Sequence, residues 1–323
     1  MKLDNSKMKA KETNTVKRRE FLMAAAATGL AGCATGGGKS CCAGKAGCAT
    51  GAKILFGACR PLKEAKLLKK HGYDFIEIGA ADAFIPTKSD EEWKKRKDEI
   101  LSCGLPLRSC NGFLPGSFRL TGPKADFAPV LDYAEKVLRR ADEVGTKTIV
   151  FGSGGARNVP GDICGPRDQA PNPEKGVEQF TDFCRQLCKR VEDLKTVQVV
   201  IEPLRPNESN IINYVWQGMQ IVRDVNHPRL QQLADLFHMI CGREPACSIV
   251  EAGEHLKHCH IACKATRQYP GTRPDDAETF KPYFDALKKI GYAGGVSCEC
   301  GWPRGAEFEK ALDTALALMK SLA

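Results

Sequence analysis

The chain has 323 residues, of which 42% are hydrophobic and 27% are charged, and its formal net charge at pH 7 is +9. It has sixteen cysteines, but their spacings do not form the framework of a small disulfide-stabilised domain, and the length allows a larger core. The positive charges are spread along helix-like segments. They form no basic stripe interleaved with aromatic residues, which argues against nucleic-acid binding.

Residues 1–32 have the features of an export signal. A polar, basic start leads through Arg18-Arg19 into a short apolar run from Met23 to Leu30. That run is too short to cross a bilayer as a helix, and the twin arginines resemble a twin-arginine signal peptide. Leu30-Ala31-Gly32-Cys33 is similar to a bacterial lipobox, in which cleavage precedes the cysteine, and this makes Cys33 the predicted lipidation site. The alternative is a plain signal peptide with an incidental cysteine.

Residues 33–52 are rich in Gly, Ala, Ser, Lys and Cys, a composition that predicts a flexible tether. Cys41, Cys42 and Cys48 could bind a metal or form a disulfide, although an unstructured linker is the favoured interpretation. The N-terminal region therefore predicts an exported protein of a bacterium. It would be periplasmic or a membrane-anchored lipoprotein, and would touch the membrane only through its N-terminal lipid.

Residues 53–323 contain eight segments with the apolar character of buried strands, and each is followed by a helix-like stretch. Strict strand–helix alternation with short connections predicts a parallel sheet, and a count of eight predicts a closed (β/α)8 TIM barrel. No Gly-x-Gly-x-x-Gly motif follows the first strand, which argues against a dinucleotide-binding fold. The predicted strands span residues 54–57, 74–78, 105–110, 148–151, 197–202, 230–235, 257–261 and 295–299.

Four residues at the ends of consecutive predicted strands can bind a divalent metal. They are Glu202, Asp235, His260 and Glu299. In a parallel barrel the carboxyl ends of the strands form the face on which active sites are built. Three carboxylates and one imidazole make a mixed oxygen and nitrogen ligand set suited to Mn²⁺, Mg²⁺ or Co²⁺. A lone acidic residue at a strand end is usually a helix cap, but four such coincidences favour a metal site.

The segments around these residues resemble those of the sugar isomerase/epimerase superfamily, the xylose isomerase-like barrels that include the ketose 3-epimerases. The resemblance covers roughly residues 53–320 in layout and is sharpest from 199 to 302. It is carried by Ile201-Glu202-Pro203-Leu204, Ala234-Asp235-Leu236-Phe237-His238-Met239, His258-Cys259-His260 and Ser297-Cys298-Glu299.

This resemblance implies that the four residues hold one divalent cation, with Mn²⁺ as the first choice and Mg²⁺, Co²⁺ or Zn²⁺ as alternatives. The implied substrate is a small carbohydrate, and the implied reaction removes a proton next to its carbonyl through a metal-stabilised enediolate. Glu202 and Glu299 would move the proton as well as bind the metal. By the same resemblance, His238, Glu208 and Arg267 would contact the substrate.

Two further features have competing interpretations. The run from Phe151 to Arg157 is rich in glycine and follows a strand, so Arg157 could pair with an anionic group, although a tight turn at the barrel rim is favoured. His255 and His258 are predicted to lie at a helix end or on the outer face of a strand.

Three other functions compete with epimerisation. An abasic-site endonuclease of the same fold would need histidines on the second and third strands, which end instead in Glu77-Ile78-Gly79 and Ser109-Cys110-Asn111. A metal-dependent lyase or hydrolase of 3-keto-glycosides could use the same metal and carboxylates. A non-catalytic carbohydrate-binding lipoprotein is the third alternative. The sequence leaves the sugar and the oligomeric state open, with a homo-oligomer among the alternatives.

The predicted signal can be tested in cells. Replacing Arg18 and Arg19 by Lys should leave uncleaved precursor in the cytoplasm, because the pair marks the twin-arginine route. Cys33→Ser should abolish labelling with a radioactive fatty acid. Both are measured by cell fractionation and gel analysis. Normal export of the twin-lysine variant would show that another pathway is used.

Overall fold

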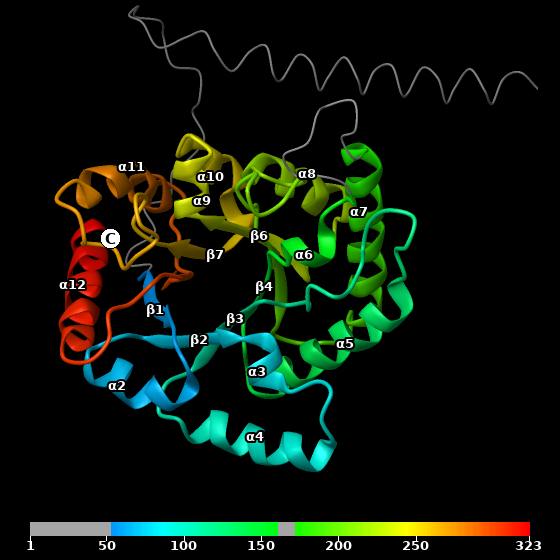
Figure 1. The fold of residues 1–323 in the computed structure, drawn as a ribbon, viewed down its shortest axis with the longest axis horizontal. Helices are drawn as coiled ribbons and strands as arrows, with labels where there is room; N and C mark the ends of the chain where they lie inside the picture. The colour runs from blue at the N-terminus through cyan, green and yellow to red at the C-terminus, as the bar shows by residue number, and fades with distance from the viewer. Residues whose placement is uncertain (1–52, 161–171) are drawn as a thin grey trace, which may run out of the picture. The chain divides into compact units, whose positions relative to one another are not determined.

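A computed structural model of the protein describes residues 53–160 and 172–323. In this part of the chain eight strands alternate with helices and close into one barrel in the order β1 to β8, with the helices arranged around it (Figure 1). The predicted (β/α)8 barrel is confirmed. The predicted signal, tether and lipidation site at Cys33 lie outside the described residues, as do Cys41, Cys42 and Cys48.

All neighbouring strands pair in parallel, and β1 pairs with β8 to close the barrel, with Leu55 opposite Gly295. Each predicted strand is present, and its bounds differ from the prediction by no more than two residues. The strands are β1 Leu55–Cys59, β2 Phe75–Gly79, β3 Leu107–Asn111, β4 Thr148–Phe151, β5 Gln198–Ile201, β6 Leu230–Asp235, β7 Leu256–Ile261 and β8 Gly295–Cys298.

The long helices have local start signals in the sequence. Ser89 and Glu92 form a capping box at the start of one helix, and Asn172 caps another that has proline at its first position. The α-helices are α2 Ala65–Lys70, α3 Ala80–Phe84, α4 Asp90–Ser102, α5 Phe127–Glu143, α6 Gly154–Arg157, α7 Pro173–Arg190, α8 Val215–Val225, α9 Leu236–Cys241, α10 Cys247–Ala252, α11 Asp276–Lys289 and α12 Glu307–Leu322. Within residues 53–160 and 172–323 there are also two 3₁₀ turns, Leu62–Glu64 and Gly253–His255.

The short helices α3, α6 and α9 were not predicted from the sequence, because each spans at most six residues and has too few turns to show a helical repeat. Helix α8 begins only at Val215. The preceding loop turns at Ile212, whose φ of 59° is incompatible with a right-handed helix.

The strands direct alternate side chains into and out of the barrel. Val150, Val200 and Leu233 form a small apolar cluster of their own, separate from the main core that the helices cover. Successive strand residues point to opposite faces. Glu202 and Asp235, each two residues after a member of this cluster, therefore continue the inner face at the carboxyl end of the barrel.

Arg157 is a structural residue and not an anion-binding one. Its side chain is fully buried, and its guanidinium donates to the carbonyl oxygens of Phe151, Glu202 and Ile212 at 3.1, 2.8 and 3.3 Å. Burial lowers its pKa to about 10. The predicted turn at the rim is thus a helical turn, α6, whose arginine fixes the ends of β4 and β5. The alternative interpretation, pairing with an anionic ligand, was wrong because the donors are already used.

Among the described residues no helix is long and apolar enough to cross a membrane. The cysteines of this part are free thiols, and Cys110 and Cys298 are buried in the core, where a thiol packs as a small apolar side chain.

Arg157→Met should destabilise the barrel, because each buried carbonyl left without a donor costs about 1–3 kcal/mol. The free energy of unfolding, measured by urea denaturation, should fall by several kcal/mol. Arg139→Met is the matched control. It removes ion pairs with Glu135 and Asp193 and an exposed hydrogen bond to the carbonyl oxygen of Arg190, and should cost less than about 1 kcal/mol. Equal losses in the two variants would contradict the role given to Arg157.

Candidate metal centre

The four predicted metal ligands converge at the carboxyl end of the barrel. One oxygen from each of Glu202, Asp235 and Glu299 and one nitrogen of His260 lie within 4.8 Å of one another. We call these four residues the ligand cluster. His260 Nδ1 is 3.1 Å from Glu202 Oε1 and 3.7 Å from Glu299 Oε2, so this nitrogen faces the carboxylates.

Asp235 contributes to the cluster with one of its two oxygens. Its Oδ1 accepts hydrogen bonds from the backbone N–H of Phe237 and His238 and so caps helix α9. Its Oδ2 lies 3.4 Å from His238 Nε2. The last residue of β6 therefore starts a helix and presents a carboxylate oxygen at the same time.

Glu202 lies against the backbone of the loop after β4. A Cβ atom added at Gly152 would be 2.2 Å from Glu202 Oε2. Only glycine leaves room for the carboxylate at this position, which gives the first glycine of the loop a reason beyond the turn itself.

Glu299 is held by two donors. Asn111 Nδ2 donates to Oε1 at 2.9 Å, and Arg267 Nη2 donates to Oε2 at 3.1 Å. Burial and the nearby carboxylates of Glu202 and Asp235 raise the pKa of Glu299 to about 7, although His260 acts in the opposite direction. Three carboxylates are thus crowded together, and a cation would relieve their mutual repulsion.

The three predicted substrate contacts lie at the rim of the ligand cluster. Arg267 bridges Glu208 and Glu299, with Nη1 donating to Glu208 Oε1 at 2.8 Å, and it adopts a left-handed φ of 53°. His238 is buried, and Glu208 Oε2 lies 3.8 Å from its Nε2. Within the described residues neither ring nitrogen of His238 has a hydrogen-bond partner. A ligand hydroxyl could supply one.

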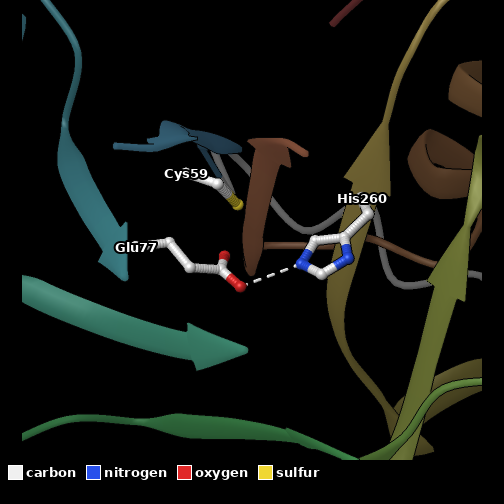
Figure 2. A group of neighbouring side chains, drawn as sticks. All are labelled: Cys59, Glu77 and His260. Carbon is white, nitrogen blue, oxygen red and sulfur yellow. Dashed lines mark hydrogen bonds and ion pairs between the residues drawn. The ribbon is translucent and has the colours of Figure 1, made fainter. Parts of the chain in front are cut away.

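Glu77 and His258 were not predicted as site residues. Both are buried inside the barrel, where Glu77 Oε2 lies 2.8 Å from His258 Nε2. Glu77 Oε1 lies 3.0 Å from His260 Nε2 (Figure 2). The prediction that His258 lies at a helix end or on an outer strand face was wrong. It shares the face of His260, two residues further along β7.

This arrangement shifts the pKa values of Glu77 and His260. Burial alone would raise the pKa of Glu77, but His260 and His258 outweigh it and hold that pKa well below its usual range. Burial would likewise lower the pKa of His260, and the charges of Glu77 and Glu299 reverse this. Each ring nitrogen of the buried His260 therefore faces a carboxylate: Nε2 faces Glu77, and Nδ1 faces Glu202 and Glu299.

The donor set of the ligand cluster fits a divalent cation. It offers three carboxylates and an imidazole nitrogen, which suits Mn²⁺, Mg²⁺, Co²⁺ or Zn²⁺. Cys59, Glu77 and His260 form a second group, in which one possible ligand atom from each residue lies within 4.8 Å of the others (Figure 2). In that second group, however, both Glu77 oxygens are occupied by histidines, and burial raises the pKa of the Cys59 thiol. The ligand cluster is therefore the better cation site.

A cavity of about 620 Å³ lies over the carboxyl ends of β1, β2 and β3. Its lining includes Cys59, Glu77 and Asn111, the last of which donates to Glu299. Volumes of this order are typical of small-molecule sites. The cavity therefore provides space for a ligand next to the cluster.

Comparisons with known proteins agree with this geometry. The family model described as xylose isomerase-like TIM barrel matches residues 65–322. A probable ketose 3-epimerase from a Synechocystis species is 28% identical over 72% of this chain and 75% of its own length. A D-psicose 3-epimerase from Agrobacterium fabrum is 28% identical over 71% of this chain and 75% of its own.

Solved structures show the same fold. A D-psicose 3-epimerase from Clostridium cellulolyticum superposes with a TM-score of 0.68 at 20% identity, covering 83% of this chain and 98% of that protein. A 3-keto-D-glucoside 4-epimerase from E. coli gives 0.67 at 22% identity, covering 83% of this chain and 100% of that protein.

Asp235→Asn should weaken Mn²⁺ binding while keeping helix α9 capped, because the amide oxygen can still accept the two backbone N–H bonds. Loss of an outer partner of a metal ligand alone costs about 10–100-fold in affinity, and removing a ligand charge should cost at least as much. The measurement is isothermal titration of Mn²⁺ into protein stripped with a chelator. Asp82→Asn, a carboxylate of the cavity wall outside the cluster, is the control and should bind as the wild type does.

Proposed function

The chain belongs to the xylose isomerase-like TIM barrel family, and on that premise we propose that it is a divalent-metal-dependent sugar epimerase acting on a ketose. The observation that carries the proposal is the ligand cluster, in which Glu202 and Glu299 approach a common centre from β5 and from the end of β8. The 3-epimerase names of the relatives support the reaction class.

In this proposal all residues of the ligand cluster bind the cation, and two of them also transfer protons. Glu202, Asp235, His260 and Glu299 would hold the cation, which when bound would stabilise the negative charge that develops on the sugar oxygens. Glu202 and Glu299 would also move the proton. One, in its ionised form, takes the proton from the carbon next to the carbonyl, and the other, in its protonated form, gives its own proton to the opposite face, which inverts that carbon.

Residues at the rim would orient the sugar. His238 has ring nitrogens without a partner in the described part of the chain, and a sugar hydroxyl would satisfy one of them. Arg267 and Glu208 form an ion pair beside Glu299, so they could bind neighbouring hydroxyls and keep the substrate carbon near the proton-transferring carboxylate.

We also propose that the enzyme is exported and lipid-anchored. The twin arginines and Cys33 of residues 1–33 support this location. A cofactor bound inside a folded barrel would suit a route that carries folded proteins.

A second candidate substrate is a 3-keto-glycoside. The cavity favours it, because its lining runs from Cys59 to Arg96 on helix α4 and leaves room beyond the ligand cluster for an aglycone. The same proton abstraction would then either invert a carbon or expel the aglycone.

The proton-transfer proposal predicts different losses for different cluster residues. Glu202→Gln and Glu299→Gln keep a carbonyl ligand oxygen but cannot act as a base, so turnover should fall by about 10²–10⁴-fold. A variant that lacks the base for one face should still exchange a substrate proton with heavy water from the other. Nuclear magnetic resonance with a panel of ketoses and 3-keto-glycosides follows exchange, inversion and aglycone release in one experiment.

Asp285→Asn, which changes an exposed carboxylate paired with Lys281 on helix α11, serves as the control and should keep wild-type turnover. Aglycone release in place of inversion would favour the lyase. Full turnover of both glutamine variants at saturating metal would contradict the assignment of the proton to these carboxylates.

A further inference from the structure

We propose that Glu77 is a positioning residue that holds the His260 ring with Nδ1 directed at the ligand cluster. Glu77 is fully buried on β2, and His260 is fully buried on β7. Two strands, β1 and β8, separate β2 from β7 around the barrel. The contact between Glu77 and His260 therefore crosses the barrel interior and is not a contact between neighbouring strands (Figure 2). The inference rests on the proposed function, because it concerns a ligand of the proposed cation.

The geometry determines which nitrogen carries the proton. An ionised carboxylate only accepts hydrogen bonds. His260 Nε2, 3.0 Å from Glu77 Oε1, must then be the donor. A neutral imidazole that donates from Nε2 has its free electron pair on Nδ1, and Nδ1 is the nitrogen that faces Glu202 and Glu299. Glu77 thus selects the tautomer that can bind a cation in the cluster.

His258 holds Glu77 in place. Its Nε2 is 2.8 Å from Glu77 Oε2, and its ring packs edge-on against Phe75 with ring centroids 6.1 Å apart. The carboxylate therefore bridges two imidazoles with one oxygen each. Both of its oxygens are used, so it cannot rotate without breaking a buried hydrogen bond.

A glutamine at position 77 could not accept a hydrogen bond from both histidines. It has one accepting oxygen and one donating NH₂ group, so one histidine would have to offer an unprotonated Nε2. If that is His260, the proton moves to Nδ1 and blocks the cation site. If it is His258, the proton moves to His258 Nδ1, a buried atom with no partner in the described chain. Either outcome weakens the placement of His260.

The test measures Mn²⁺ binding to the metal-stripped full chain, by the electron paramagnetic resonance signal of the free ion. Glu77→Gln should weaken binding by about 10–100-fold, as for other residues that orient a metal-binding histidine. Glu77→Asp keeps an ionised acceptor and should bind Mn²⁺ more tightly than the glutamine variant but less tightly than the wild type. If the glutamine variant does not fold, the Mn²⁺ affinity of the aspartate variant is compared with that of the wild type instead.

Thr148→Val is the structural control, since it removes a buried hydrogen bond to Ser109 on the strands β3 and β4. It should lower the unfolding temperature without changing Mn²⁺ affinity. Wild-type affinity in Glu77→Gln, or an equal loss in the threonine control, would overturn the positioning role while leaving the cation site intact. A wild-type protein that binds none of Mn²⁺, Mg²⁺, Co²⁺ and Zn²⁺ in isothermal titration would overturn the metal-dependent function and this inference with it.

Discussion

The structure of the site depends on a single buried imidazole that lies between carboxylates. His260 is fully buried, with Glu77 on its Nε2 side and Glu202 and Glu299 on its Nδ1 side. Desolvation would lower the pKa of such a ring, but the surrounding negative charge raises it instead. The negative charge exceeds what one imidazole and the Arg267 guanidinium can balance. A bound cation is the natural complement of such an arrangement.

The barrel can hold this concentration of charge because an apolar layer of its interior is separate from the layer that contains the acidic residues. Val150, Val200 and Leu233 fill part of the interior with apolar groups, and the acidic residues follow them on the same strand faces. The carboxylates of the ligand cluster thus lie at the carboxyl end of the barrel. Arg157 fixes the backbone carbonyl of Glu202 from behind, so the position of this carboxylate is set by the ends of β4 and β5 together.

Much of the fold could be predicted from the sequence because the strands and long helices carry local signals. Apolar segments such as Val199–Ile201 are followed directly by a polar residue, here Glu202. Parallel strands place their carboxyl ends on one face. That rule brings Glu202, Asp235, His260 and Glu299 to the same end of the barrel without knowledge of any contact. The short helix α9 escaped prediction, since its start depends on a capping bond from Asp235 and not on a helical repeat.

Glu77 and His258, which lie deeper in the barrel than the ligand cluster, could not be predicted with the same rule. Strands of a parallel barrel are buried on both faces, so the run Phe75-Ile76-Glu77-Ile78 does not show which residues point inward. The partner of Glu77 is also on a distant strand, and only the closed barrel brings the two together. One signal was present: His258 stands two residues before His260 and must share its face.

The two oxygens of Asp235 have separate tasks, and this restricts how the enzyme could change its sugar preference. No loop separates β6 from helix α9, since Asp235 ends the strand and caps the helix that carries His238. His238 therefore cannot be repositioned, by evolution or by design, without disturbing Asp235 of the ligand cluster. In the long connection 262–275 after β7 no residue belongs to the ligand cluster, and only the Arg267 side chain contacts it, through Glu299. New substrate preferences should therefore arise first in that connection, while α9 stays fixed.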